Sequence, residues 1–313
     1  MFITPVKYLF GITMKDIDKE FLNKKRPKQL HDVHHKDYEL IIKHYQKIID
    51  KDKDVSDAYV NLGFIYLDKE DYDKALKCFQ KIVELEPANP ESYNNLGYIH
   101  EKMDMLDSAK KCYEKALELD KNDLEAIINI GHIFELQGDY HSALNQYKRA
   151  IKIEPKNLSA RFSLAVLYDR HDMYDDALAE YSQIIQINPS HTKAIYNLGR
   201  INFQFGNYAD ALNNFQHVLK LDPENADAWN NLGSVYETTN NMAEAVSAYR
   251  KSLTYNPLNE ETNLNLSNIQ YSLYLSNPKS FKISDIVRRL LFVLSLNPHN
   301  NKVQNLLDKI QKP

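Results

Sequence analysis

Hydrophobic and small residues recur along this chain with a period of 34 residues between residues 56 and 259. We number each of the six copies from 1, so that Ser56 occupies position 1 of the first copy. Position 7 is always Leu or Ile, position 8 is Gly or Ala, position 20 is Ala, and position 24 is Phe or Tyr. Position 32 is Pro except in the second copy, where it is Lys121. A fixed period without an inserted residue indicates one supersecondary unit repeated in tandem.

The spacing within each copy predicts two short helices joined by a turn. Positions 4, 7, 8 and 11 share one face of a helix with 3.6 residues per turn. Small residues at positions 8 and 20 let the two helices approach closely, and the aromatic residue at position 24 fills the space between hairpins. Proline at position 32 ends the second helix. Because one hairpin cannot bury its apolar face alone, the hairpins must stack.

The two ends of the chain depart from this period. Residues 1–36 form an N-terminal extension, and residues 37–55 form a half repeat that supplies only a second helix. Residues 260–300 are a degenerate seventh copy with about seven inserted residues, for which residues 276–280 are the expected loop. Residues 301–313, with Leu306, Leu307 and Ile310, predict a C-terminal capping helix. The whole chain is expected to contain about fifteen short helices.

The sixth copy shows the pattern most fully, in Trp229, Leu232, Gly233, Tyr236, Ala245, Tyr249 and Pro257. This spacing resembles the tetratricopeptide repeat family. The main departures are Ala165 at position 8 and Lys121 at position 32. The resemblance implies an all-α fold, a right-handed superhelical solenoid of stacked helix-turn-helix hairpins. It also implies a non-catalytic protein–protein interaction scaffold or adaptor that holds a partner in its concave groove.

Composition and charge bear on the partners and the compartment. The 313 residues carry a net charge of −4, and the basic residues are too dispersed for nucleic-acid binding, with a short basic run only at residues 24–28. No stretch approaches the roughly 20 apolar residues that span a membrane. Cys78 and Cys112 occupy equivalent positions of successive copies, which indicates half-buried apolar side chains in a reducing compartment. We expect a cytoplasmic protein, with an organelle or a cilium and the oligomeric state left open.

Position 6 carries asparagine in six of seven copies. Steps of about 100° per residue place positions 2, 6, 9 and 13 opposite the packed face of the first helix, and we call these positions the polar stripe. In the family that this chain resembles, the stripe lines the concave groove, where asparagines hold an extended peptide backbone. An amide suits this task because it offers a donor and an acceptor. The alternative is that these amides join neighbouring helices. The asparagines are Asn61, Asn95, Asn129, Asn197, Asn231 and Asn265.

The rest of the stripe changes in charge along the chain. Acidic and aromatic residues prevail in the early copies, with Tyr98 and Glu125 as candidate partner-binding residues. Arg170, Lys193 and Arg200 form a basic patch near copies four and five. Position 12, beside the stripe, adds Glu101, Glu135, Asp169 and Glu237. We expect these charges to select a partner, and the alternative is that they only keep the face solvated.

Other kinds of chemistry find little support in the sequence. Position 5 never carries Lys, so the clamp with which related co-chaperones hold a C-terminal carboxylate is not expected. His31, His34 and His35 lie close together, but no cysteine or acidic residue at ligand spacing completes a metal site. Phosphate-binding loops and catalytic motifs are missing. We therefore expect no cofactor, no metal and no enzymatic activity.

Three functions remain open at this point. The chain can be an adaptor that reads an extended peptide, as the asparagines favour. It can be a fixed subunit of a large ciliary, transport or organellar assembly, as the apolar residues 1–12 favour. It can also be a regulatory subunit of an enzyme that acts in trans.

Overall fold

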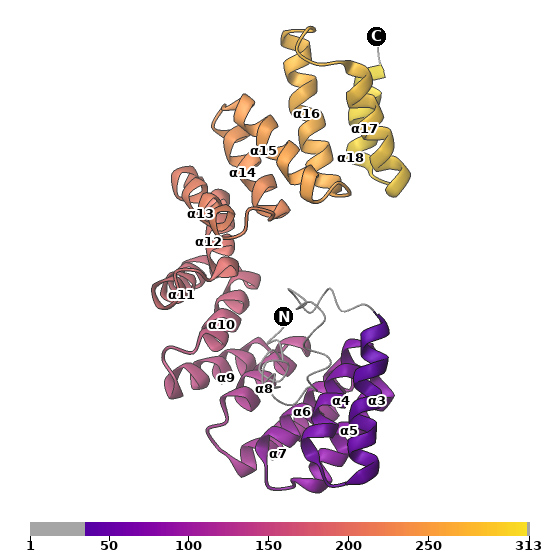
Figure 1. Ribbon diagram of the computed structural model, residues 1–313. Helices are drawn as coiled ribbons and strands as arrows, with labels where there is room; N and C mark the ends of the chain where they lie inside the picture. Colours follow the sequence, from indigo (N-terminus) through magenta and orange to yellow (C-terminus); the bar gives the residue numbers. More distant parts are fainter. Residues whose placement is uncertain (1–34, 312–313) are drawn as a thin grey trace. The chain divides into compact units, whose positions relative to one another are not determined.

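A computed structural model describes residues 35–311 of the chain, and within them it is entirely α-helical, with sixteen helices and no strand (Figure 1). The extension up to residue 34, with its basic run and with His31 and His34, lies outside the described residues, as do residues 312 and 313. None of the described helices is long and apolar enough to cross a membrane. The helices are α3 (His35–Lys51), α4 (Ser56–Asp68), α5 (Tyr72–Leu85), α6 (Pro90–Lys102), α7 (Leu106–Leu119), α8 (Leu124–Leu136), α9 (Tyr140–Ile153), α10 (Leu158–Arg170), α11 (Tyr174–Ile187), α12 (Thr192–Gln204), α13 (Tyr208–Leu221), α14 (Ala226–Thr238), α15 (Met242–Tyr255), α16 (Glu260–Ser276), α17 (Ile283–Leu296) and α18 (Asn301–Gln311).

Each of the six regular copies forms a hairpin of a 13-residue helix and a 14-residue helix, as the period predicts. Short polar residues cap many of these helices at their N-termini. The Asp123 carboxylate, for example, accepts a hydrogen bond of 2.9 Å from the backbone N–H of Ala126 in α8. The second helix of the second copy ends at Leu119 although Lys121 replaces the usual proline. The capped turn that follows is therefore sufficient to end the helix.

The packing inside each hairpin confirms the close approach predicted for positions 8 and 20, and it places the aromatic ring of position 24 against the glycine of its own hairpin. The alanine at position 20 is completely buried in all six copies. A Cβ atom added to Gly97 at position 8 would lie 2.6 Å from the ring of Tyr113 at position 24. The missing side chain of the glycine is thus the space that the tyrosine ring fills.

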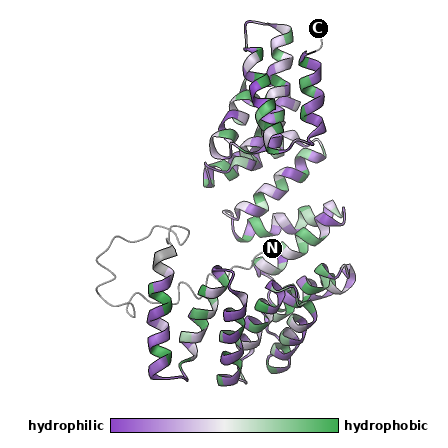
Figure 2. Ribbon diagram, turned by 90° about the vertical axis from the view of Figure 1, so that its right-hand side faces the viewer, coloured by the Kyte–Doolittle hydropathy of each residue, from purple (hydrophilic) through white to green (hydrophobic). Residues whose placement is uncertain are grey.

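The chain divides into two compact units, Met1–Leu167 and Tyr168–Pro313, and the boundary falls inside α10. We describe each unit by itself. Along single helices, hydrophobic and hydrophilic residues alternate, as expected for helices that bury only part of their surface (Figure 2).

The inserted residues of the seventh copy are shared between a helix and a turn. Helix α16 has 17 residues instead of 13, and the connection to α17 has six residues instead of three. The expected loop at 276–280 therefore begins where α16 ends. Helix α18 buries Val303, Leu306 and Leu307 against α17, so that it covers the end of the second unit.

Candidate functional site

Three of the four acidic residues at position 12 accept hydrogen bonds from the tyrosines at position 24 of the same hairpin. The Tyr249 hydroxyl donates to Glu237 Oε2 at 2.7 Å, and the equivalent bonds are Tyr147 to Glu135 at 3.0 Å and Tyr113 to Glu101 at 3.3 Å. All three tyrosines are at most 1% exposed. A buried phenol hydroxyl needs a hydrogen-bond acceptor. The carboxylates at position 12, beside the polar stripe, therefore act as acceptors within the hairpin.

Two copies carry Phe instead of Tyr at position 24, and they also lack the acid at position 12. Phe79 is accompanied by Leu67, and Phe215 by Phe203. The residue at position 12 therefore changes with the presence of the hydroxyl. The sequence contains this correspondence between positions 12 and 24. It can be recognised only after the structure shows that the two positions are in contact.

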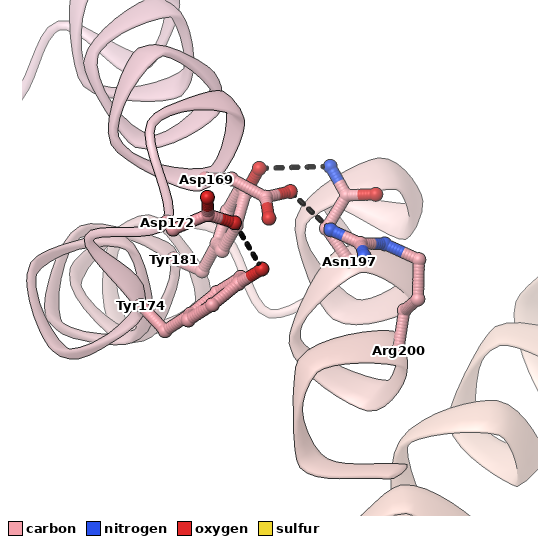
Figure 3. A network of polar contacts seen from close by, with 6 residues as sticks. All are labelled: Asp169, Asp172, Tyr174, Tyr181, Asn197 and Arg200. Atoms are coloured by element: carbon pink, nitrogen blue, oxygen red, sulfur yellow. Dashed lines mark hydrogen bonds and ion pairs between the residues drawn. The ribbon is translucent and has the colours of Figure 1, made fainter. Parts of the chain in front are cut away.

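Some of these acids also join one copy to the next. His132 Nδ1 lies 3.2 Å from Glu101 Oε1, and both residues belong to the first unit. In the second unit, Arg200 forms an ion pair and a hydrogen bond with Asp169 (Figure 3). Position 9 of one copy thus faces position 12 of the copy before it. Arg200, a candidate partner-binding residue, is already engaged within the protein.

The asparagines of the polar stripe in the second unit bond to the preceding copy. Asn197 Nδ2 donates to the Tyr181 hydroxyl at 3.0 Å (Figure 3). Asn231 Nδ2 donates to the Tyr196 hydroxyl at 2.8 Å. Asn265 Nδ2 lies 3.4 Å from Asn230 Oδ1. Here the amides hold neighbouring copies together.

The asparagines of the first unit make fewer such bonds. Asn61 Nδ2 donates at 2.7 Å to the backbone carbonyl of Asp57, one turn earlier in α4. Neither Asn95 nor Asn129 has a side-chain hydrogen bond within the described residues, although Asn95 is only 8% exposed. The residue at position 5 of the copy before Asn95 is Val60, which has no side-chain acceptor. We call the six asparagines at position 6 the asparagine ladder. Its members in the two units therefore differ in how much of their hydrogen-bonding capacity the fold uses.

A cavity of about 480 Å³ lies beside Asn61 and Asn95 in the first unit. Its walls come from α3, α4, α6 and the end of α5. They combine an apolar part with an acidic and amide part: Tyr45, Ile48, Val55, Asp57, Ala58, Val60, Asn61, Ile82, Glu86, Asn89, Glu91, Ser92 and Asn95. This volume falls within the range of ligand-binding clefts.

The polar wall of this cavity is acidic. Asp57 and Glu91 lie in the first turns of α4 and α6, and Glu86 follows the end of α5. Hydrogen bonds from the side chains of Ser56 and Asn89 lower the pKa of Glu86 and keep it ionised. The lining contains no Lys, Arg or His.

One hydroxyl in the lining is buried without a partner. Ser92 is 1% exposed, and its Oγ has no hydrogen-bond partner in the described part of the chain. An unsatisfied buried hydroxyl is costly, so Ser92 is a polar residue whose hydrogen-bonding capacity the packing of α6 does not use.

The remaining candidate residues lie apart from this cavity. Tyr98 is half-buried under the Lys102 ammonium, 5.1 Å from the ring centre, and burial raises its pKa to about 12. Glu125 is exposed in the first turn of α8, and Arg170 and Lys193 are exposed on α10 and α12. Within the described residues, no group of three or more His, Cys, Asp or Glu is arranged to hold a metal ion.

The two cysteines are free, and burial raises the pKa of each thiol to about 11. Cys112 is half-buried, as the sequence indicated, whereas Cys78 is buried. With such pKa values these thiols are poor nucleophiles at neutral pH.

The geometry defines an all-α repeat protein whose surfaces are built from tandem hairpins. Family models described as tetratricopeptide repeat match residues 54–122, 90–156, 136–198 and 196–259, roughly two thirds of the chain. The chain belongs to the tetratricopeptide repeat family, as its spacing indicated. A comparison with curated protein sequences returned no match.

Solved structures of other repeat proteins share this fold. A chain of the APC/C heterotetramer Cut9–Hcn1 has 16% sequence identity and a TM-score of 0.62, covering 88% of this chain and 53% of that one. A repeat protein from Cytophaga hutchinsonii has 17% identity and a TM-score of 0.59, covering 79% of this chain and 98% of the other. One from Parabacteroides merdae has 19% identity and a TM-score of 0.55, covering 86% and 99%. At these levels of sequence identity, the comparisons show that the proteins share a fold and nothing more.

Sequence reasoning did not single out Ser92, Glu86 or Asn89. A signal for Ser92 was present, because position 3 is Ala in the other five regular copies. A residue that breaks the repeat at a buried position, in favour of a polar group, points to a task that stacking does not explain.

Proposed function

We propose that this chain is a non-catalytic scaffold or adaptor that binds an extended peptide segment of a partner protein on the polar stripe of its first unit. Tetratricopeptide repeats are protein-interaction modules, and the chain consists largely of them. The observation that carries the proposal is the cavity of about 480 Å³ beside Asn61 and Asn95.

The chemistry of this stripe suits a peptide backbone. The Asn95 amide reaches the cavity and has no bond within the described residues, so it can donate to one peptide carbonyl and accept from a peptide N–H. Asn129 continues the ladder in the third copy, and Tyr98 and Glu125 lie on the same stripe. These residues form our proposed path of the peptide.

The second unit has a different place in this proposal. Its ladder members Asn197, Asn231 and Asn265 already donate to the preceding copy, and Arg200 is paired with Asp169. We assign them to stacking. Arg170 and Lys193 remain the candidate basic residues on the exposed surface of this unit.

An array of random nonapeptides, probed with the full-length chain, tests the proposal. We expect a reproducible set of peptides to bind, and we expect the double variant Asn61→Ala, Asn95→Ala to lose most of that binding. The matched control is Asn231→Ala, Asn265→Ala, which changes the same residue type at the same position of two later copies. Circular dichroism verifies that both variants are folded.

The proposal fails if no peptide binds the wild-type chain. It also fails if the control variant loses binding as much as the first-unit variant does, because the asparagines would then act only through stability.

A second function is supported by the surface of α17. Leu291, Phe292 and Leu296 are 51%, 40% and 45% exposed on this helix. Exposed apolar side chains grouped in this way favour a fixed subunit of an assembly. Under this alternative, Leu291→Ser with Phe292→Ser releases the chain from the complex in which it sediments in cell extract, while Asn61→Ala with Asn95→Ala does not.

The thiols bear on the compartment. Two free cysteines support the proposal that the protein works in a reducing, intracellular compartment.

A further inference from the structure

The second unit carries a cavity of about 430 Å³ between the consecutive helices α13, α14 and α15 (Figure 1). We infer that this cavity is a second partner site, which takes an acidic segment of a partner protein in which a carboxylate stands beside an aromatic or aliphatic side chain. The inference does not depend on the proposed function, because the peptide site proposed above belongs to the first unit.

Part of the cavity lining is aromatic and aliphatic. Trp229 and Tyr236 of α14 are half-buried there, and Leu219 and Leu232 are buried beside them. The indole N–H of Trp229 already donates to the Pro223 carbonyl oxygen at 2.9 Å. What the Trp229 ring offers to a ligand is therefore its apolar surface, which suits an aromatic or aliphatic side chain.

Two lysines bring positive charge to the same cavity. Lys220 comes from α13 and Lys251 from α15, while Glu244 is the one acid in the lining. The Lys251 Nζ atom lies 4.1 Å from the centre of the Trp229 ring, so the ammonium is held over the apolar surface. Neither lysine forms an ion pair within the part of the chain that the structure describes. An anion that enters the cavity meets two cations that the fold has not neutralised.

The other copies show that this lack of ion pairs is unusual. Lys251 occupies position 26, and position 29 lies three residues later on the same helix face. In the second copy Lys115 at position 26 pairs with Glu118 at position 29 at 2.7 Å, and the first copy has the equivalent pair. In the sixth copy position 29 is Thr254, and in the fifth copy it is Lys220. The acids that neutralise these lysines in the first unit are thus replaced where the chain lines the cavity.

Positive charge continues on the next pair of helices. The Arg289 side chain on α17 is half-buried, and its Nη1 atom donates to Gln270 Oε1, a neutral acceptor, at 2.7 Å. Burial and the nearby charge of Arg250 lower the pKa of Arg289. Neither arginine forms an ion pair within residues 35–311. A further carboxylate of the same acidic segment would relieve the repulsion between these two guanidinium groups.

An exposed aromatic side chain extends the surface on α17. Phe292 is 40% exposed and is the tenth residue of its 14-residue helix, as Lys251 is of α15. The same place holds Lys, Arg, Ser or His in all six regular copies. Cations interspersed with apolar side chains match a protein segment that alternates carboxylates with apolar residues. Single-stranded nucleic acid also combines negative charge with flat rings, and the experiment includes it as an outcome.

The single tryptophan of the chain makes occupancy of this cavity directly measurable. An array of random nonapeptides without tryptophan is probed with the full-length Asn61→Ala, Asn95→Ala variant, which lacks the two amides of the first-unit site. We expect the binders to be enriched in Asp or Glu next to an aromatic or aliphatic residue. The best binder is then titrated into the full-length wild-type chain while the fluorescence of Trp229 is recorded. We expect a saturable change in emission, and at least about tenfold weaker binding when the peptide carries Asn and Gln for its Asp and Glu.

Variants assign the preference to the cavity. Lys220→Ser with Lys251→Ser should weaken binding of the acidic peptide about tenfold and make its salt dependence shallower. The matched control is Lys81→Ser with Lys115→Ser, which removes the same charge from two lysines that are already paired with glutamates. The control should bind the acidic peptide as the wild type does, and circular dichroism verifies that both variants are folded.

Several results would overturn the inference. It is wrong if the array yields no acidic binder, if acidic peptides bind without changing the emission of Trp229, or if the control pair weakens binding as much as the cavity pair does. The assignment to a protein segment is wrong if an oligothymidylate of the same length changes the Trp229 emission at equal or lower concentration. None of these results bears on the first-unit site, which is tested by its own asparagine variants.

The chain also has an acidic segment of its own, with Asp16, Asp18 and Glu20, which lies outside the described residues. The variant Asp16→Asn, Asp18→Asn, Glu20→Gln tests this occupant. If this variant has altered Trp229 emission without any peptide and binds the acidic nonapeptide more tightly, the cavity holds the chain's own segment and the assignment to a partner is wrong. Unchanged emission and affinity support the partner.

Discussion

The pairing of Tyr249 with Glu237 predicts a specific pattern of stabilities. Tyr249 is fully buried, and its hydroxyl donates to Glu237 Oε2 at 2.7 Å. A second oxygen, Ser234 Oγ, lies 3.2 Å from the hydroxyl. We compare three variants: Glu237→Leu, Tyr249→Phe and the two combined. The double variant reproduces the pair that occurs naturally as Phe79 with Leu67.

The expected magnitudes follow from which group loses its partner. A hydrogen bond to a charged group contributes about 1.5–3 kcal/mol, and a buried hydroxyl left alone costs about 1–3 kcal/mol. Because Ser234 can still accept, Glu237→Leu should cost about 1–2 kcal/mol. Tyr249→Phe should cost about 1 kcal/mol, since Glu237 is half-buried and regains water. The double variant should lie within about 0.5 kcal/mol of the wild type, because no polar group is left unpaired.

Chemical denaturation followed by circular dichroism gives the free energy of unfolding for each variant. Because repeat arrays can unfold in parts, amide hydrogen exchange in α14 and α15 provides a local measure of the same effect. The reasoning is refuted if the two single costs add in the double variant, since position 12 would then stabilise the hairpin independently of the hydroxyl. It is also refuted if Glu237→Leu alone is neutral.

Three further predictions follow from other contacts. Phe79→Tyr should destabilise the protein by about 1–3 kcal/mol and Leu67→Glu should recover most of the loss, measured by the same denaturation; a loss that persists in the double variant would contradict the pairing. Gly131→Ala places a Cβ atom 2.6 Å from a ring carbon of Tyr147, so we expect a cost of about 1–3 kcal/mol and an altered near-ultraviolet spectrum, and an unchanged spectrum would contradict the close contact. The thiols of Cys78 and Cys112, with pKa values of about 11, should be alkylated at pH 8 about a hundredfold more slowly in the folded chain than in the unfolded chain, and equal rates would show that they are exposed.

A fifth prediction concerns pH. The pKa of Glu86 is lowered in the folded state by hydrogen bonds from Ser56 and Asn89. The folded state therefore binds the Glu86 proton less readily than the unfolded state does, so its contribution to stability is present above pH 4.5 and is lost as the pH falls below it. Glu86→Gln should flatten this acid limb in thermal melts between pH 6 and pH 3. An acid limb as steep as that of the wild type would contradict this assignment.

Much of the fold was predictable because the same sequence pattern occurs in six consecutive copies. The 34-residue period, the alanine at position 20 and the aromatic residue at position 24 predict helical hairpins, and Gly97 against Tyr113 shows the contact behind that period. The irregular seventh copy was harder to predict. Sequence spacing shows that residues are inserted, but only the structure shows that four of them lengthen α16.

The use of the polar residues was less predictable, because it depends on neighbours from other copies. The sequence alone suggests that Arg200 is available to a partner, but it forms an ion pair with Asp169 of the preceding copy. Glu101 reads as part of an acidic surface, yet it accepts a hydrogen bond from Tyr113 and pairs with His132. A pattern within one copy cannot show such contacts.

The asparagine ladder illustrates how one residue type at one position can have two tasks. Asn231 and Asn265 follow copies whose position 5 is Tyr196 or Asn230, and both of these side chains accept the amide proton. Asn95 follows a copy whose position 5 is Val60, so that the preceding copy offers no side-chain acceptor. An asparagine at position 5 is not sufficient, since Asn129 follows Asn94 and the Asn94 Oδ1 atom has no hydrogen-bond partner within the described residues. Replacing Val60 by Tyr, the residue type that accepts from Asn231, should give Asn95 an internal partner, strengthen the stacking of the first two copies and weaken peptide binding at the cavity. A Val60→Tyr variant that binds peptide as well as the wild type would show that position 5 does not decide between stacking and recognition.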